Sequence, residues 1–144
     1  MASIPGRVLA IDYGSKRTGL AVSDPLGIAA HPLDPVVSTD LQETVQAIVR
    51  EIREREVRTV LLGMPFLRSG LEGGQAQRVR FFLGELRKHM PADVVILERD
   101  ERFTTAEAES LWRRAGIQKR KAKPYLDSTA AVIVLREYLG EQEA

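Results

Sequence analysis

Alternating apolar and polar residues near the amino terminus predict three short strands. Val8–Ile11 is apolar on both of its faces, which is typical of a central strand that is covered on both sides. Thr18–Ser23 runs back after a turn at Gly14–Arg17, so a hairpin is expected. Ile28–His31 and Val36–Val37 supply a third strand that prolines interrupt. Because proline cannot donate to a sheet ladder, we expect this strand at an edge of the sheet.

From about Leu41 onward the pattern changes to helices that alternate with strands. Asp40 can cap a helix that begins near Leu41, and Val57–Met64 and Asp93–Glu98 are predicted strands. Two core-facing stripes at helical spacing are predicted: Leu41, Val45, Ile48, Val49 and Ile52, and then Ala76, Val79, Leu83, Leu86 and Met90. Three turn-linked strands followed by strands and helices in alternation predict an α/β fold, a mixed sheet with helices on both faces. The first strand lies at its centre if it pairs with both the second and the fourth.

The last third of the chain predicts two helices with a basic loop between them. The first helix begins near Thr104 and ends at Gly116, and Gly116–Pro124 is expected to be a loop. The last helix should run from about Tyr125 to Leu139. It is nearly apolar around Ala130–Leu135, so it should be well buried.

Two further features allow more than one interpretation. The segment Phe66–Gly74 follows a predicted strand and combines exposed apolar residues with glycines. It is either a mobile flap over a site or a long connection, and the sequence favours neither. His31 stands beside Pro32 with no second histidine nearby, so an edge position is favoured over a role as metal ligand.

Length and composition place the chain in an ordinary class. Its 144 residues predict a single domain over residues 1–144, and 44% hydrophobic and 28% charged residues are globular values. The net charge of +1 means that any contact with nucleic acid must be local. There is no cysteine, and no apolar run is long enough to span a membrane. We expect a soluble, cytoplasmic protein that does not bind membranes.

Carboxylates stand at the points where predicted elements meet. Asp12 ends the first strand, Glu101 follows the last strand, and Asp127 lies in the first turn of the last helix. Oxygen ligands of this kind suit Mg²⁺ or Mn²⁺, and two such ions can activate water and stabilise the leaving oxygen of a phosphodiester. Glu98 and Asp100 compete for the role of Glu101. For Asp12 alone, hydrogen bonding to the turn amides is the alternative.

Four segments resemble the motifs of the YqgF (RuvX) family. They read IDYGSKRTGLAVSD, LLGMP with a glycine-bearing loop, DERFTTAEAE and LDSTAAVIVLREYL, in this order and over nearly the whole chain. The family groups Holliday-junction-resolvase-like proteins of the ribonuclease H-like superfamily, described as candidate pre-16S ribosomal RNA nucleases. The resemblance implies a ribonuclease H-like five-stranded sheet and acid ligands at Asp12, Glu101 and Asp127. It also implies processing of the 5′ end of the 16S rRNA precursor.

Two small departures from the family pattern concern other residues. FLRSG follows LLGMP where a polar residue near its centre is expected, and FTT replaces the more usual Leu-Ser-Thr after DER. Neither affects a predicted ligand. Resolvases of the RuvC kind use four acids, whereas three are identified here, which favours RNA cleavage over junction cleavage.

Basic residues close to the predicted acids are candidate contacts for the substrate backbone. They are Lys16 and Arg17 in the first turn, and Lys119, Arg120, Lys121 and Lys123 in the basic loop. The alternative is that the loop is merely solvated. If these residues bind phosphates, the partner is structured RNA, with branched DNA as a second class of substrate.

Three functions remain in competition. The first is a metal-dependent nuclease with two Mg²⁺ or Mn²⁺ ions, and the second is a nucleic-acid-binding module with little cleavage. A phosphotransferase related to sugar kinases is the third, because its phosphate loop also reads Asp-x-Gly-Ser, but 144 residues leave no room for its duplicated domain. The sequence leaves open the position and mode of cleavage, the metal used in cells, and whether the protein is a monomer or a homodimer.

Overall fold

Five strands form one mixed sheet in this structure, which is a computed structural model. It describes residues 6–65, 69–100 and 119–143, and only the backbone at 119–127, 129 and 143. The strands lie side by side in the order β3-β2-β1-β4-β5. Their bounds are β1 Arg7–Asp12, β2 Arg17–Ser23, β3 Ala30–Val37, β4 Val57–Met64 and β5 Val95–Asp100.

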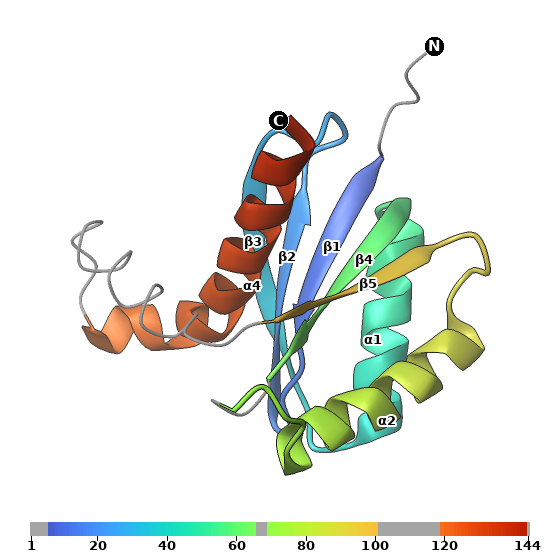
Figure 1. Cartoon of the computed structure of the whole chain (residues 1–144), viewed down its shortest axis with the longest axis vertical. Helices are drawn as coiled ribbons and strands as arrows, with labels where there is room; N and C mark the ends of the chain where they lie inside the picture. The colour runs from blue at the N-terminus through green and yellow to red at the C-terminus, as the bar shows by residue number, and fades with distance from the viewer. Residues whose placement is uncertain (1–5, 66–68, 101–118, 144) are drawn as a thin grey trace.

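The first strand lies at the centre of the sheet, as the sequence predicts. β1 pairs antiparallel with β2, where Asp12 lies opposite Gly19, and parallel with β4, where Ile11 lies opposite Leu62. β2 pairs antiparallel with β3, and β4 pairs parallel with β5. The proline-containing β3 is therefore an edge strand, which confirms that expectation. The carboxyl ends of β1, β4 and β5 open on one edge of the sheet (Figure 1).

Helices cover both faces of the sheet. The described helices are α1 (Leu41–Glu54), α2 (Gly74–His89) and α4 (Lys119–Glu143). Figure 1 shows α1 and α2 on one side of the sheet and α4 on the other. Side chains alternate between the two faces of the sheet along β1, so this strand contributes to the hydrophobic core on each face. Leu9 and Ile11 pack in the core with α1 and α2, whereas Val8 and Ala10 pack in the core with α4.

Local signals in the sequence place helix α1 correctly. The Asp40 side chain accepts hydrogen bonds from the backbone N–H of Gln42, at 2.8 Å, and of Glu43, at 3.1 Å. Four of the five residues of the predicted stripe are buried, and Leu41 is partly buried against the same core. In α2 the buried residues include Phe82 in addition to four of the predicted five, while Met90 caps the helix end.

Two predicted boundaries are wrong. The last helix begins at Lys119, so residues 119–124 are helical rather than part of a loop, and Pro124 lies inside α4. Lysine, arginine and alanine are good helix formers, so they continue the helix upstream of the proline. The first turns of α4, drawn in orange, run at an angle to the rest of the helix (Figure 1), as an internal proline favours.

The last strand runs from Val95 to Asp100, two residues later than predicted. The Val94 N–H donates to the Pro91 carbonyl oxygen at 3.3 Å, so the chain is still turning there, and pairing with β4 begins opposite Thr59. The predicted helix beginning near Thr104 and the carboxylate of Glu101 lie outside the described residues.

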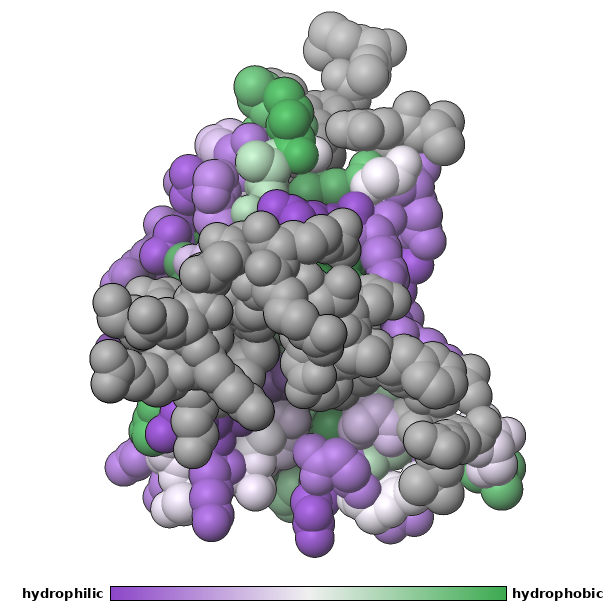
Figure 2. Space-filling model, turned by 90° about the vertical axis from the view of Figure 1, so that its left-hand side faces the viewer, coloured by the Kyte–Doolittle hydropathy of each residue, from purple (hydrophilic) through white to green (hydrophobic). Residues whose placement is uncertain are grey.

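The described surface is mainly hydrophilic on the face shown in Figure 2, with an apolar patch toward its upper end. In the described residues, six large apolar side chains are more than half exposed: Leu26, Ile28, Val37, Leu71, Phe81 and Val95. Among the described helices, none combines the length and the apolar composition needed to cross a membrane.

Candidate active site

Asp12 is the last residue of β1 and lies at the carboxyl edge of the sheet. It shares the parity of Val8 and Ala10, so it belongs to the face that α4 covers. It is half-buried, and its partner across the strand pair is Gly19, which has no side chain. The Asp12 side chain therefore lies on the same face of the sheet as the helix that carries Asp127.

The turn after Asp12 needs glycine at one position. A Cβ added to Gly14 would lie 2.2 Å from the carbonyl oxygen of Arg17, closer than real Cβ atoms approach a backbone atom. The Thr18 hydroxyl closes the turn, because it accepts from the Gly14 N–H at 3.4 Å and donates to the Gly14 carbonyl oxygen at 3.3 Å. The side chains of Lys16 and Arg17 are exposed at this turn, beside Asp12.

Ser128 anchors helix α4 on the sheet close to Asp12. Its side chain is fully buried, and its hydroxyl donates to the carbonyl oxygen of Leu33 at 2.7 Å while accepting from the Leu20 N–H at 3.4 Å. The ladder between β2 and β3 shifts register between Thr18 and Leu20, so the hydroxyl occupies an irregular point of that ladder. Leu20 follows Gly19, the partner of Asp12, so Ser128 brings position 127 of α4 toward the Asp12 end of the hairpin.

Replacing Ser128 by alanine is expected to destabilise the protein by about 1–3 kcal/mol, because a buried donor and a buried acceptor lose their partner. Any chemistry carried out at Asp12 should be impaired as well, since α4 is no longer fixed beside it. Urea unfolding measures the first effect. Ser128→Thr, which keeps the hydroxyl, is the matched control. If the alanine variant unfolds at the same urea concentration as the wild type, Ser128 does not anchor the helix.

Strand β5 separates the acidic candidates by face. Glu98 accepts two hydrogen bonds from Arg80 of α2, from Nη1 and Nη2 at 3.1 Å each. The next residue, Arg99, pairs with Glu141 of α4 at 2.7 Å and lies 5.1 Å from the ring centroid of Tyr138. Because strand alternation puts Asp100 on the same face as Glu98, both lie on the α2 face, opposite Asp12. Glu98 and Asp100 therefore do not share the face of Asp12, and because Glu101 lies outside the described residues the choice among the three stays a prediction.

The end of the segment Phe66–Gly74 is tied to the sheet through one arginine. Arg80 donates to Glu72 through Nε at 2.7 Å and Nη2 at 2.8 Å, in addition to its contacts with Glu98. These hydrogen bonds hold the pKa of the Glu72 carboxyl below its usual value. Residues 66–68 lie outside the described residues, so the choice between a flap and a connection stays a prediction.

Only part of the predicted site can be compared with the structure. Asp12, Lys16 and Arg17 gather at one edge of the sheet. Glu101 lies outside the described residues, and for Asp127 and the four basic residues of α4 only the backbone is described. Within the described residues no group of three or more metal-binding side chains is found, and that search does not reach two of the three predicted ligands. The acidic trio therefore stays a prediction.

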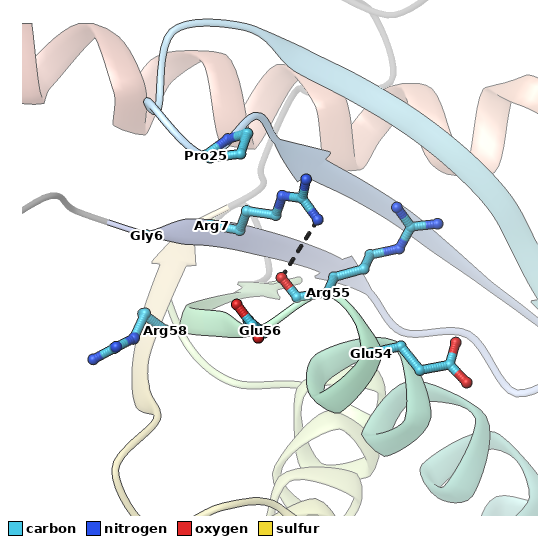
Figure 3. A pocket seen from close by; sticks show the side chains of 7 residues that line it. All are labelled: Gly6, Arg7, Pro25, Glu54, Arg55, Glu56 and Arg58. Atoms are coloured by element: carbon cyan, nitrogen blue, oxygen red, sulfur yellow. Dashed lines mark hydrogen bonds between the residues drawn. The ribbon is translucent and has the colours of Figure 1, made fainter.

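A cavity of about 390 Å³ lies at the opposite edge of the sheet, near the beginning of β1 and β4. It is lined by Gly6, Arg7, Pro25, Glu54, Arg55, Glu56 and Arg58. Arg7 donates to the backbone oxygen of Arg55 at 3.5 Å, while the side chain of Arg58 points away from both (Figure 3). These side chains do not converge on a common point, so this cavity does not compete with the edge at Asp12.

Sequence reasoning gave Ser128 no role of its own. Its anchoring role depends on Leu33 and Leu20, which are 95 and 108 positions away in the chain. The small hydroxyl residue directly after Asp127, at the start of an apolar helix, was the available signal. Sequence reasoning also missed Tyr13, whose ring stacks on Phe82 beside the site.

The order of the strands and the placement of the helices identify the class of fold. The fold resembles that of Holliday junction resolvases, and it is the ribonuclease H-like fold. A fowlpox virus resolvase in complex with Holliday junction DNA matches with a TM-score of 0.63 at 10% identity, covering 96% of this chain and 99% of the other. Thermus thermophilus RuvC with a Holliday junction matches with a TM-score of 0.57 at 16% identity, covering 96% of each chain.

Sequence comparison gives the family. The model of the RuvX family, described as Holliday junction resolvase, matches residues 6–141, and the chain belongs to this family. A relative from Endomicrobium trichonymphae named "Putative pre-16S rRNA nuclease" is 36% identical over 137 residues, which cover 94% of this chain and 96% of the relative. A relative of the same name from Halalkalibacterium halodurans is also 36% identical, over 95% of this chain and 98% of its own.

Proposed function

We propose that this protein is a metal-dependent nuclease that trims the 5′ end of the 16S rRNA precursor. The observation that carries the proposal is Asp12 at the carboxyl edge of the central strand, facing the helix that Ser128 anchors. Open α/β sheets bind their ligands at this edge. The relatives of similar length that are named for pre-16S rRNA cleavage support the choice of substrate. Such a substrate places the protein in the cytoplasm.

The donor set fits a hard divalent cation. Asp12, Glu101 and Asp127 supply carboxylate oxygens only, and Mg²⁺ or Mn²⁺ prefers such ligands over nitrogen or sulfur. One or two bound ions would supply a nucleophilic water and offset negative charge on the leaving oxygen. The chain's own contribution is to hold two of these carboxylates in place: Asp12 by the strand, and position 127 by the helix anchored at Ser128. Asp100 lies on the α2 face of the sheet with Glu98, opposite Asp12, and this supports Glu101 over Asp100 as the third ligand.

Basic residues on both sides of the edge are proposed to hold the substrate backbone. Lys16 and Arg17 are exposed at the hairpin turn, and Lys119, Arg120, Lys121 and Lys123 belong to the first turns of α4. Because the structure makes these turns helical, the four residues are carried on the same element as Asp127. The helix, rather than a loop, then sets their spacing along a phosphate backbone.

Replacing Lys119, Arg120 and Lys121 by alanine is expected to flatten the salt dependence of RNA binding. Each lost phosphate contact removes about 0.9 from the log–log slope on a duplex, or about 0.7 on a single strand. Fluorescence anisotropy over a range of KCl concentrations measures the slope. The control variant removes three charges elsewhere, at Arg50, Arg53 and Arg87 on α1 and α2. Equal slopes for both variants would mean that the basic turns of α4 do not contact the substrate.

Junction DNA is the second candidate substrate. The likeness to two resolvases that were solved with Holliday junctions favours it at the level of the fold. Cleavage tests on precursor rRNA and on a four-way DNA junction, each with Mg²⁺ or Mn²⁺ and with Asp12→Asn as the inactive control, separate the candidates. We expect cleavage of the RNA that the Asp12 variant lacks. Cleavage of the junction alone would change the substrate, and binding without cleavage of either would identify a nucleic-acid-binding module.

A further inference from the structure

A second cavity opens at the same edge of the sheet as Asp12, but on the side of helix α2. Its volume is about 420 Å³, and it is lined by Tyr13, Gly74, Gln77, Arg78 and Phe81. Tyr13 follows Asp12 directly in the chain, so their Cα atoms are about 3.8 Å apart. Tyr13 packs against the core with α1 and α2, whereas Asp12 belongs to the α4 face. The edge of the sheet therefore separates the two side chains.

The Tyr13 wall of this cavity is held in place. The Tyr13 ring stacks on the ring of Phe82, with centroids 4.4 Å apart and planes inclined by 16°. Phe82 is fully buried in α2, and Nε2 of Gln75 donates to the backbone oxygen of Tyr13 at 3.4 Å. A surface built on such contacts changes little when a ligand arrives, so binding costs little ordering.

The helix wall combines an aromatic ring, a cation and an amide. Phe81 stands next to the buried Phe82 but is 64% exposed. Gln77 and Arg78 precede it by four and three residues, so all three share one face of α2. The lining includes no carboxylate, and the first turn of α2 carries no acidic residue. Nη1 of Arg78 donates to the Gln75 side chain at 3.3 Å, and within the described residues no ion pair engages its remaining N–H groups.

We propose that this cavity binds an unpaired nucleotide of the substrate, with the base on the ring of Phe81 and the guanidinium of Arg78 on a phosphate. Exposed aromatic rings are the platforms on which proteins stack single-stranded bases. A cation without a neighbouring carboxylate favours a phosphate over an acidic or neutral peptide. The Gln77 amide can both donate to and accept from the edge of a base.

The position of the cavity next to Asp12 links the binding of this nucleotide to the position of cleavage. The proposal rests on the proposed nuclease function: the phosphate to be cleaved lies at Asp12, and a neighbouring nucleotide crosses the edge of the sheet to reach the α2 side. A strand can follow such a path only where it is not paired. The enzyme then cleaves next to a single-stranded segment, and the base in the cavity fixes the position of the cut.

The test is binding of a short single-stranded RNA and of a blunt RNA duplex, measured by fluorescence anisotropy in the Asp12→Asn background, where no cleavage interferes. Phe81→Ala should weaken single-strand binding about 5- to 100-fold, since one base–aromatic stack is lost. Duplex binding should stay the same. Phe81→Tyr, which keeps the ring, should bind like the parent. Arg78→Ala should weaken single-strand binding as well, and Arg87→Ala, at the other end of α2, is its control for a lost charge.

A single abasic nucleotide, moved along the RNA, completes the test. At one position it should weaken binding to the parent but not to Phe81→Ala, because the two changes remove the same contact. Equal single-strand affinity of the parent and Phe81→Ala would overturn the inference, and so would equal losses on single strand and duplex. A change in oligomeric state with unchanged RNA affinity would assign Phe81 to a protein contact instead. If Phe81→Ala in the otherwise wild-type protein cleaves the RNA at the same position as the wild type, the inference about this cavity fails while the proposed nuclease function stands.

Discussion

Asp12→Asn is expected to abolish metal-dependent cleavage while the fold stays intact. Asn keeps the shape of the side chain but removes a negative ligand from the carboxyl edge of β1, where the cations and the phosphate charge must be balanced. Loss of an outer-shell partner already costs metal sites about 10- to 100-fold, so loss of a ligand should cost about 100-fold or more. The initial rate of cleavage of labelled precursor RNA at saturating Mg²⁺ measures the effect, and circular dichroism checks the fold.

Glu101→Gln and Asp127→Asn are expected to behave in the same way, because each removes one member of the proposed trio. Asp100→Asn is the matched control. By strand alternation Asp100 lies on the α2 face with Glu98, so its replacement should cost much less. Wild-type activity in any of the three variants would remove that residue from the site. A loss in Asp100→Asn as large as in Glu101→Gln would exchange their assignments.

Gly14→Ala is expected to disturb the turn that holds Asp12 and Lys16. The added Cβ would lie 2.2 Å from the Arg17 carbonyl oxygen, a backbone atom that cannot move without opening the hairpin. Overpacking of this kind costs about 1–3 kcal/mol, or about 2–12 °C in melting temperature for a chain of this length. Cleavage should fall further than stability alone explains, because the catalytic strand ends at this turn.

Gly84→Ala provides the control for Gly14→Ala. A Cβ at Gly84 meets no atom within 4 Å, and the residue lies inside helix α2. Alanine should therefore leave the melting temperature unchanged or raise it, since glycine costs a helix about 0.5–1 kcal/mol. If both alanine variants melt together with the wild type, the Gly14 turn is looser than the close approach to Arg17 implies.

Much of the fold could be predicted because its signals are local. Val57–Met64 is a largely apolar stretch that Pro65 ends, and the structure confirms both of its bounds. The stripe of α1 and its Asp40 cap are likewise encoded within a few turns of helix. The central position of β1 followed from its apolar character on both faces. These features need no information from distant parts of the chain.

The wrong sequence predictions concern features that depend on contacts with distant parts of the chain. The start of β5 is set by pairing with Thr59 of β4, which its own sequence does not reveal. Pro124 suggested a helix boundary, yet α4 extends upstream of it to Lys119. Phe81 and Phe82 are neighbours of identical type, yet Phe82 is buried in the core with α1 and stacks on Tyr13, whereas Phe81 is exposed.

In the candidate site, too, the features encoded locally could be predicted and those set by distant contacts could not. Asp12 could be predicted as a site residue from the end of an apolar strand, and its place at the sheet edge agrees with that interpretation. The assignments of Glu101 and Asp127 came from their places at the ends of predicted elements and from the family resemblance, and they stay predictions. The hydroxyl of Ser128 could not be interpreted from sequence, because its partners lie on two strands far away in the chain.

The shift in melting temperature caused by Mn²⁺, compared between the wild type and Asp12→Asn, tests the central claim most directly, because it needs no substrate. Three close carboxylates repel one another, and an ion that binds only the folded state stabilises it by about 1.4 kcal/mol at ten times its dissociation constant. The wild type should gain about 2–6 °C. Asp12→Asn should melt at or above the wild type without metal and gain less from Mn²⁺. Equal shifts in both proteins, or a metal-free variant that melts well below the wild type, would contradict the claim that Asp12 is a metal ligand.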